Sequence, residues 1–149
     1  MTSTPLIDAW QAALASEHQA FFGYGLLGPR LASAAERARA RTMQQAHATL
    51  RDATQAALFA TGQTPVAPLA DYPALYPVSS PKAALDLAVR IETACSSAWR
   101  YLYSVAAVPG GDASVRTSAQ QALIDSAVRA TQWRLSAGVA ASTVAFPGI

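Results

Sequence analysis

Three breaks divide this chain into four long segments in which proline occurs only near an end, at Pro5, Pro81 and Pro147. The breaks are residues 28–29, residues 62–80 and residues 109–111, where proline and glycine concentrate. Alanine, the residue with the highest intrinsic helix propensity, recurs through all the segments between them. Aromatic residues make up only 8% of the chain, which argues against an all-β fold. We therefore predict an all-α protein, with residues 1–149 forming one domain around one core.

Four helices are predicted over residues 5–27, 34–61, 81–107 and 113–137. Ser33 and Glu36 have the spacing of a capping box at the start of the second helix. Ser80 followed by Pro81 is typical of a helix start, and Asp112 is a favourable N-cap for the last helix. These local signals fix the predicted starts of three of the four helices.

The segment 62–80 is long for a loop in a compact protein and contains Pro65, Pro68, Pro73 and Pro77. Fully extended, it reaches at most about 60 Å, whereas the second helix should be about 42 Å long. It can therefore travel along the bundle and start the third helix at the opposite end. Two helix pairs joined by one long crossover is the arrangement of ferritin-like four-helix bundles. An up-down-up-down bundle with a flexible proline-rich loop is the alternative.

Charge and composition argue against several classes of partner. The net charge is +2, and the eleven basic residues form no dedicated patch for nucleic acid. No stretch approaches the roughly 20 apolar residues that span a membrane. Residues 1–10 lack the pattern of a secretory signal, and the single cysteine, Cys95, fits a reducing compartment. We predict a soluble, cytoplasmic protein.

Four ionisable residues are predicted to face the axis of the bundle at one level. Glu17, His47, Glu92 and Asp125 each lie on or near the apolar stripe of their helix, close to its midpoint. At about 1.5 Å per residue, their heights along the bundle agree within about 3 Å. Any chemistry of this chain is therefore expected where these side chains meet.

A Glu, a His, a Glu and an acid on successive helices resembles the di-iron pattern of ferritin-like proteins. The whole chain also resembles an uncharacterised actinobacterial ferritin-like family, a domain of unknown function. That likeness is carried by Glu17-His18, Gly23-Tyr24-Gly25, His47, Arg51-Asp52, Glu92 and Ala145-Phe146-Pro147-Gly148. The resemblance implies a fold, because no activity is assigned to that family.

Two ligand positions of the di-iron pattern are altered. Gln44 replaces the Glu of the Glu-x-x-His motif on the second helix, and Val128 stands where the fourth helix should carry a His. The amide of Gln44 is a weak ligand and cannot supply the charge that bridges two metals. Arg51 and Arg129, one turn after His47 and Asp125, are also predicted to point at the cluster, where their charges would pair with carboxylates.

The sequence therefore favours a network of buried ion pairs without cofactor or catalytic activity, formed by Glu17, Gln44, His47, Arg51, Glu92, Asp125 and Arg129. Such a chain would be a structural or interaction protein. The alternative is a metal-binding protein or metalloenzyme that holds iron, manganese or zinc with Glu17, His47, Glu92 and Asp125.

One surface feature of the first helix suggests a partner. Phe22 and Leu26 lie about 140° and 180° around the helix from Glu17 and should face outward. Large apolar side chains on an outer face are usually covered by something. We predict a homodimer contact here, with packing beneath the crossover as the alternative. The sequence does not identify any other protein partner.

Overall fold

The structure is a computed structural model that describes residues 4–149. Residues 1–3, which belong to the segment predicted not to be a secretory signal, lie outside the described residues. Its four α-helices are α1 (Thr4–Leu27), α2 (Ala34–Ala60), α3 (Pro81–Ala106) and α4 (Ala113–Ser136). Two short 3-10 turns follow α1 and precede α3, η1 (Gly28–Arg30) and η2 (Pro73–Leu75). Residues 4–149 contain no β-strand, which confirms the all-α class. None of the helices in this range is long and apolar enough to cross a membrane.

The helix starts follow the caps expected from the sequence. Ser33 Oγ accepts a hydrogen bond from the backbone N–H of Glu36, and the Glu36 carboxylate accepts one from the backbone N–H of Ser33, both at 3.1 Å. Ser80 Oγ accepts from the N–H of Ala83 at 3.0 Å, and Asp112 caps α4 through two backbone N–H groups. Because these caps satisfy donors that have no partner inside the helix, the boundaries agree with prediction within about one residue.

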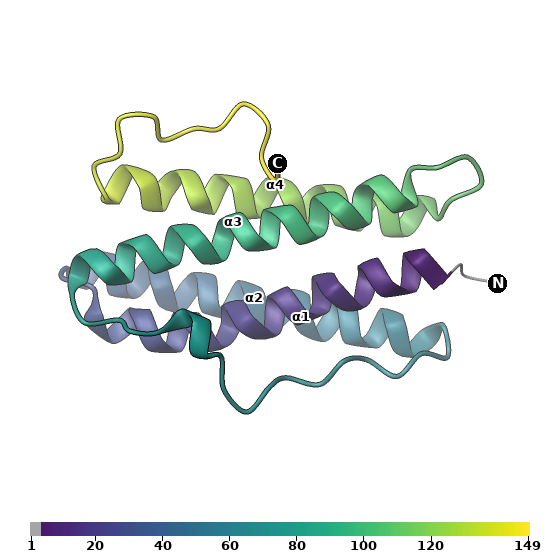
Figure 1. The fold of residues 1–149 in the computed structure, drawn as a ribbon, viewed down its shortest axis with the longest axis horizontal. Helices are drawn as coiled ribbons and strands as arrows, with labels where there is room; N and C mark the ends of the chain where they lie inside the picture. The colour runs from purple at the N-terminus through teal and green to yellow at the C-terminus, as the bar shows by residue number, and fades with distance from the viewer. Residues whose placement is uncertain (1–3) are drawn as a thin grey trace.

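Figure 1 shows the helices as two antiparallel pairs, α1 with α2 and α3 with α4. Helix α3 packs against both α1 and α4, so it joins the two pairs. The segment 61–80 runs along the outside of α1 and α2 from the end of α2 to the start of α3 (Figure 1). Helices α2 and α3 consequently point in the same direction.

Side chains of α1 hold the first part of this connecting segment. The amide of Gln11 donates to the carbonyl of Thr64 and accepts from the N–H of Val66, each at 2.8 Å. His18, which is buried, contributes a hydrogen bond of 3.0 Å from Nε2 to the carbonyl of Val66. These bonds fix an irregular segment that would otherwise expose its backbone groups.

The apolar residues predicted to face outward on α1 are partly covered by the same segment. The ring of Phe22 lies 5.2 Å from that of Tyr72, measured between centroids. Phe22 and Leu26 are both half-buried and pack against the core. The connecting segment therefore supplies the cover for Phe22, as the alternative interpretation proposed. The homodimer stays a prediction.

Helix α4 turns a different face inward from the one predicted. Its large apolar residues Ile124, Val128 and Leu135 are 47%, 51% and 62% exposed. The buried residues of α4 are mainly small and are Val115, Ala119, Ala122, Ser126, Ala130 and Trp133. Helix α4 therefore packs against α3 largely through small side chains. The prediction that Asp125 faces the axis of the bundle was wrong, because the face of α4 that carries it is exposed.

Candidate functional site

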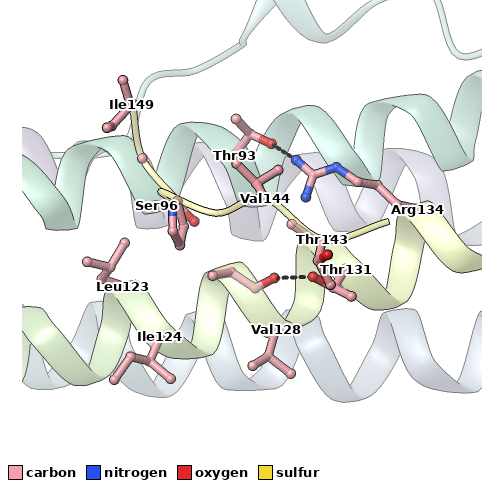
Figure 2. Close-up of a pocket in the computed structure, with 14 residues that line it drawn as sticks. Thr93, Ser96, Leu123, Ile124, Val128, Thr131, Arg134, Thr143, Val144 and Ile149 are labelled. Atoms are coloured by element: carbon pink, nitrogen blue, oxygen red, sulfur yellow. Dashed lines mark hydrogen bonds between the residues drawn. The ribbon is translucent and has the colours of Figure 1, made fainter. Parts of the chain in front are cut away.

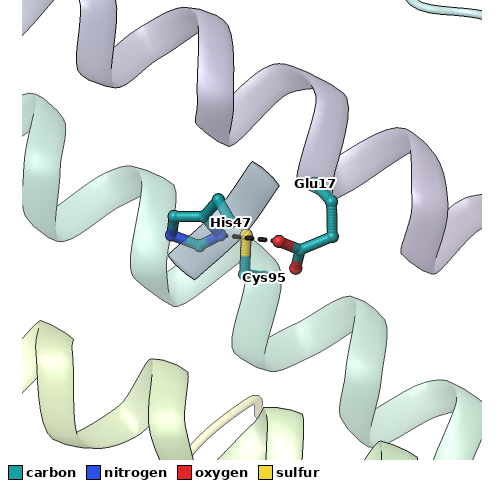
Figure 3. Close-up of side chains that lie close together, drawn as sticks. All are labelled: Glu17, His47 and Cys95. Carbon is teal, nitrogen blue, oxygen red and sulfur yellow. Dashed lines mark hydrogen bonds and ion pairs between the residues drawn. The ribbon is translucent and has the colours of Figure 1, made fainter. Parts of the chain in front are cut away.

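His47 lies in the interior of the bundle and joins three helices. Its Nδ1 is 2.6 Å from Glu17 Oε2 on α1, and its Nε2 is 3.0 Å from Glu92 Oε1 on α3. All three side chains are fully buried, and Figure 3 shows the contact with Glu17. An ionised carboxylate can only accept hydrogen bonds, so both ring nitrogens must carry a proton. The imidazole is therefore a cation held between two anions.

Both carboxylates receive further donors from neighbouring helices. Trp99 Nε1 donates to Glu17 Oε1 at 2.7 Å. The hydroxyl of Tyr24 donates to Glu92 Oε1 at 2.6 Å, and Arg129 Nε donates to Glu92 Oε2 at 3.0 Å. Each carboxylate oxygen of the two glutamates thus accepts at least one hydrogen bond. Because every carboxylate oxygen has a hydrogen-bond donor, the two carboxylates can stay ionised inside the protein.

A hydrogen-bonded chain links α4 to this centre. Trp133 Nε1 donates to the hydroxyl oxygen of Tyr24 at 2.7 Å, and the Tyr24 hydroxyl in turn donates a hydrogen bond to Glu92. The sulfur of Met43 lies 3.4 Å from the same hydroxyl. Because a tyrosine hydroxyl has one proton, and the Glu92 contact is short, the Met43 contact is packing. We call Glu17, Tyr24, His47, Glu92, Trp99, Arg129 and Trp133 the buried cluster.

The charges of the buried cluster balance. Burial alone would lower the pKa of His47, but its hydrogen bonds to Glu17 and Glu92 outweigh burial and raise it to about 9. Burial would raise the pKa of Glu92, yet the bonds and charge of His47 and the charge of Arg129 hold it below its usual range. Two anions thus face two cations, His47 and Arg129, and the net charge is zero at neutral pH.

The structure places Asp125 outside the cluster. Its carboxylate is exposed and accepts a hydrogen bond from Gln121 at 2.9 Å, one turn away on the same helix. The next residue, Ser126, is buried instead and accepts a hydrogen bond from Arg129 at 3.2 Å. The different inward face of α4 explains this shift, because a residue rotated by about 100° leaves the interior.

Arg51 and Gln44 also lie outside the cluster. The guanidinium of Arg51 pairs with the exposed carboxylate of Asp52 at 2.8 Å and lies 4.8 Å over the ring of Phe21. Gln44 donates to the backbone carbonyl of Phe21 at 3.1 Å. Phe21 itself is 37% exposed and lies at the edge of the buried face of α1. Long polar side chains reach the surface when they start at the edge of a buried face.

Three hydrogen-bond donors of the cluster were not predicted from the sequence. They are Tyr24, Trp99 and Trp133. Each carries one polar group on a large apolar ring, and such a group usually finds a partner when it is buried. A buried aromatic donor at the level of a buried acid is the signal that would have identified them.

Cys95 brings a second kind of donor atom beside the cluster. Its sulfur, an imidazole nitrogen of His47 and a carboxylate oxygen of Glu17 lie within 4.8 Å of one another (Figure 3). Burial raises the pKa of the Cys95 thiol well above its usual value, and the charges of Glu17 and Glu92 raise it further. These residues could hold a metal only after His47 and Cys95 both lose a proton.

Comparisons with other proteins give a family match and a similar solved structure. The model of a family described as a domain of unknown function, DUF4439, matches residues 9–149. None of the curated proteins matches the chain. The crystal structure of a conserved hypothetical protein, rv2844, from Mycobacterium tuberculosis is similar, with a TM-score of 0.82 and 32% sequence identity. The match covers 91% of this chain and 99% of that one.

Proposed function

Because this chain belongs to the DUF4439 family of domains of unknown function, we propose its function from the buried cluster itself. The protein is a non-catalytic, ferritin-like structural or interaction protein. In it, ion pairs and hydrogen bonds occupy the position at which related bundles hold metal. The buried cluster fixes how the helix pairs pack, which is the role that satisfied buried networks can have.

The observation that carries this proposal is the pair of hydrogen bonds made by His47. A metal ligand must offer a lone pair, and a histidine that donates from both nitrogens has none. Arg129 places a permanent positive charge 3.0 Å from Glu92, which repels an incoming cation. A metal ion would have to displace a proton from His47 and separate Glu92 from two cations.

The ferritin-like assignment is supported by the topology of the helices and by the common height of Glu17, His47 and Glu92 along the bundle. Helices α2 and α3 run parallel, with one long segment between them along the bundle (Figure 1). Up-down bundles with short loops lack such a connection. Glu17, His47 and Glu92 meet from three helices at one height, as the ligands of di-iron bundles do.

The second candidate function is metal binding, favoured by the proximity of Glu17, His47 and Cys95. A carboxylate, an imidazole and a thiolate together suit zinc or iron, and the carboxylate of Glu92 is a further possible ligand. Manganese, also predicted from the sequence, is less suited to a thiolate. Asp125 is no longer part of this ligand set.

Elemental analysis separates the two candidates. The protein is purified without chelator from cells grown with added iron, manganese and zinc. We expect far less than one metal ion per chain, and a melting temperature that none of these ions raises, since a specific ligand stabilises the folded state. One ion per chain that is lost in both His47→Ala and Cys95→Ser would refute the first candidate and establish the second.

We further propose that the protein is a homodimer in the cytoplasm, without nucleic acid or membrane partners. Large apolar side chains remain exposed, including Phe59 at 70% on α2 and Leu69 at 64% on the connecting segment. Such surface supports a contact with another chain. Sedimentation equilibrium tests the oligomeric state, and a monomer at all concentrations would contradict the dimer.

A further inference from the structure

A cavity of about 470 Å³ lies between α3, α4 and the C-terminal segment 137–149, apart from the buried cluster (Figure 2). None of the cluster residues lines it. Its apolar wall includes Leu123, Ile124 and Val128 on α4 and Val144 and Ile149 on the C-terminal segment, and the lining contains no aromatic ring. Its volume falls within the range of small-molecule sites.

The cavity accounts for the unexpected exposure of α4. Ile124 and Val128, which are about half exposed, face the cavity, and the C-terminal segment passes across it. That segment lies directly on α3 at Gly148, which has a φ of +86°. A Cβ on Gly148 would lie 2.7 Å from the carbonyl oxygen of Ser96 and 2.9 Å from Arg100 Cβ. The position of this wall therefore depends on a glycine.

A buried hydroxyl without a partner lies at the cavity. Ser96 is only 2% exposed, and its Oγ has no hydrogen-bond partner among the protein atoms of residues 4–149. Leaving such a group unpaired costs free energy, so an orphaned hydroxyl in a folded protein calls for an explanation. Ser96 lines the cavity, so its hydroxyl is available to a polar group of a ligand there.

A cation without an acidic partner lies at one end of the same cavity. Arg134 donates to Thr93 Oγ1 at 3.1 Å, and no carboxylate of residues 4–149 forms an ion pair with it. Thr93 and Ser96 are one turn apart on α3. In Figure 2, Arg134 lies toward one end of the cavity and Leu123 toward the other. The lining thus has one positive end and a long aliphatic body.

We propose that this cavity binds a fatty acid, with its carboxylate on Arg134 and its unbranched chain along α4. Arg134 lies eleven residues after Leu123 on α4, or about 16 Å along the helix, which suits an elongated ligand. A guanidinium pairs with a carboxylate through two parallel hydrogen bonds, and the unpaired hydroxyl of Ser96, one turn along α3 from Thr93, is a further donor at the cavity. Aliphatic walls without aromatic rings favour an alkyl chain over a flat ring. This inference is independent of the function proposed for the buried cluster.

The probe is dodecanoate, titrated calorimetrically below the concentration at which it forms micelles. We expect saturable binding of one dodecanoate per chain, weakened at least about tenfold in Arg134→Ala, because every 1.4 kcal/mol is a factor of ten. Arg116→Ala is the matched control, since Arg116 is an exposed arginine on the same helix outside the cavity. It should bind as the wild type does.

Two further measurements make the test specific. Dodecanol, which has the same chain without the charge, should bind more weakly than dodecanoate to the wild type and equally to wild type and Arg134→Ala. Ser96→Ala should weaken dodecanoate binding while the variant folds normally, because the serine hydroxyl has no protein partner to lose. Absence of saturable binding, or equal affinity of wild type and Arg134→Ala for dodecanoate, would overturn the proposal.

Discussion

His47 and Glu17 form a hydrogen-bonded ion pair of 2.6 Å that water does not reach, since both side chains are fully buried. Removing two charges from water is costly, and their attraction repays that cost only when the remaining hydrogen-bonding groups are satisfied. Trp99 supplies the donor for the second oxygen of Glu17, and Glu92 supplies the acceptor for the second nitrogen of His47. The pair is therefore stable only as part of the whole cluster.

Replacement of Glu17 by glutamine should leave the imidazolium without one of its counter-charges. We expect a loss of about 3–5 kcal/mol in the free energy of unfolding, the usual cost of breaking a buried pair on one side. Urea unfolding at a pH below 6.5, where histidine is protonated in the unfolded chain, gives this value. Asp52→Asn, which breaks an exposed pair screened by solvent, is the control and should lose far less stability than Glu17→Gln. Equal losses in the two variants would contradict a charged His47.

Stability should fall as the pH rises from 6.5 to about 9. The pKa of His47 is raised in the folded state, to about 9, from 6.5 in the unfolded chain. The folded protein then binds more protons between these values, so the proton stabilises it below 6.5 and that stabilisation is lost through 9. The loss is on the order of 3 kcal/mol and is measured by urea unfolding across this range.

His47→Gln should remove this slope, whereas His18→Gln should keep it, because His18 bonds only to a backbone carbonyl. At acid pH the contribution of Glu92 to stability changes with pH in the opposite direction, because folding lowers the pKa of Glu92. Its contribution is present above the ordinary pKa of a glutamate and is lost as the pH falls through the lowered value. A flat stability profile between pH 6.5 and 9 in the wild type would refute a doubly protonated imidazole.

Tyr24→Phe should destabilise the protein by about 1–3 kcal/mol, although it removes a single oxygen atom. Trp133 Nε1 would then be a buried donor without an acceptor, and Glu92 would lose one of its donors. Thermal or urea unfolding measures the effect. Tyr101→Phe is a matched control, since Tyr101 is 56% exposed, and should change stability by less than about 0.5 kcal/mol. A neutral Tyr24→Phe would mean that the hydrogen-bonded chain contributes nothing.

Two glycines one half-turn apart on α1 should respond differently to alanine. A Cβ at Gly23 would collide with the end of the Ile91 side chain and lie 3.4 Å from Leu75 Cδ1. At Gly25 a Cβ would meet only the amide of Gln44, at 3.4 Å. Gly25→Ala should stabilise by up to about 1 kcal/mol through helix propensity. Gly23→Ala gains the same propensity but must displace Ile91, so it should be less stable than Gly25→Ala by about 1–3 kcal/mol in urea unfolding.

The connecting segment gives a prediction that concerns local opening. Gln11→Ala removes both side-chain bonds to Thr64 and Val66. We expect faster amide hydrogen exchange at Val66, whose N–H would lose its acceptor, with little change in exchange at α3. Gln45→Ala is the control, because Gln45 is exposed on α2 and forms no side-chain bond to this segment. Unchanged exchange at Val66 would show that the segment is held by other contacts.

The sequence predicted the helices well because their ends are marked by local chemistry. The capping box of Ser33 and Glu36 and the N-cap Ser80 act within one turn, so a reader of the chain can recognise them without knowing the fold. Glu17, His47 and Glu92 were also brought together as expected. Their neighbours include large apolar residues that define the inner faces of α1, α2 and α3.

Helix α4 could not be predicted in the same way. Its buried stripe is largely alanine and serine, and such residues do not distinguish an inner face from an outer one. Asp125 was therefore assigned to the interior from its spacing to Val128, which instead lines the cavity beneath the C-terminal segment. Although the inward face of α4 differs from the predicted one, the side chain of Arg129 is long enough to reach Glu92 from this helix.

Since His47 is the residue through which α2 enters the buried cluster, two hydrogen atoms on one ring join this helix to both α1 and α3. Deprotonation at either nitrogen would set a lone pair against a carboxylate oxygen, turning attraction into repulsion across that seam. Loss of one proton from His47 would therefore weaken the contact of α2 with α1 or with α3, while the hydrogen bonds that join α1 to α3 and α4 through Tyr24, Trp99 and Trp133 do not involve this ring.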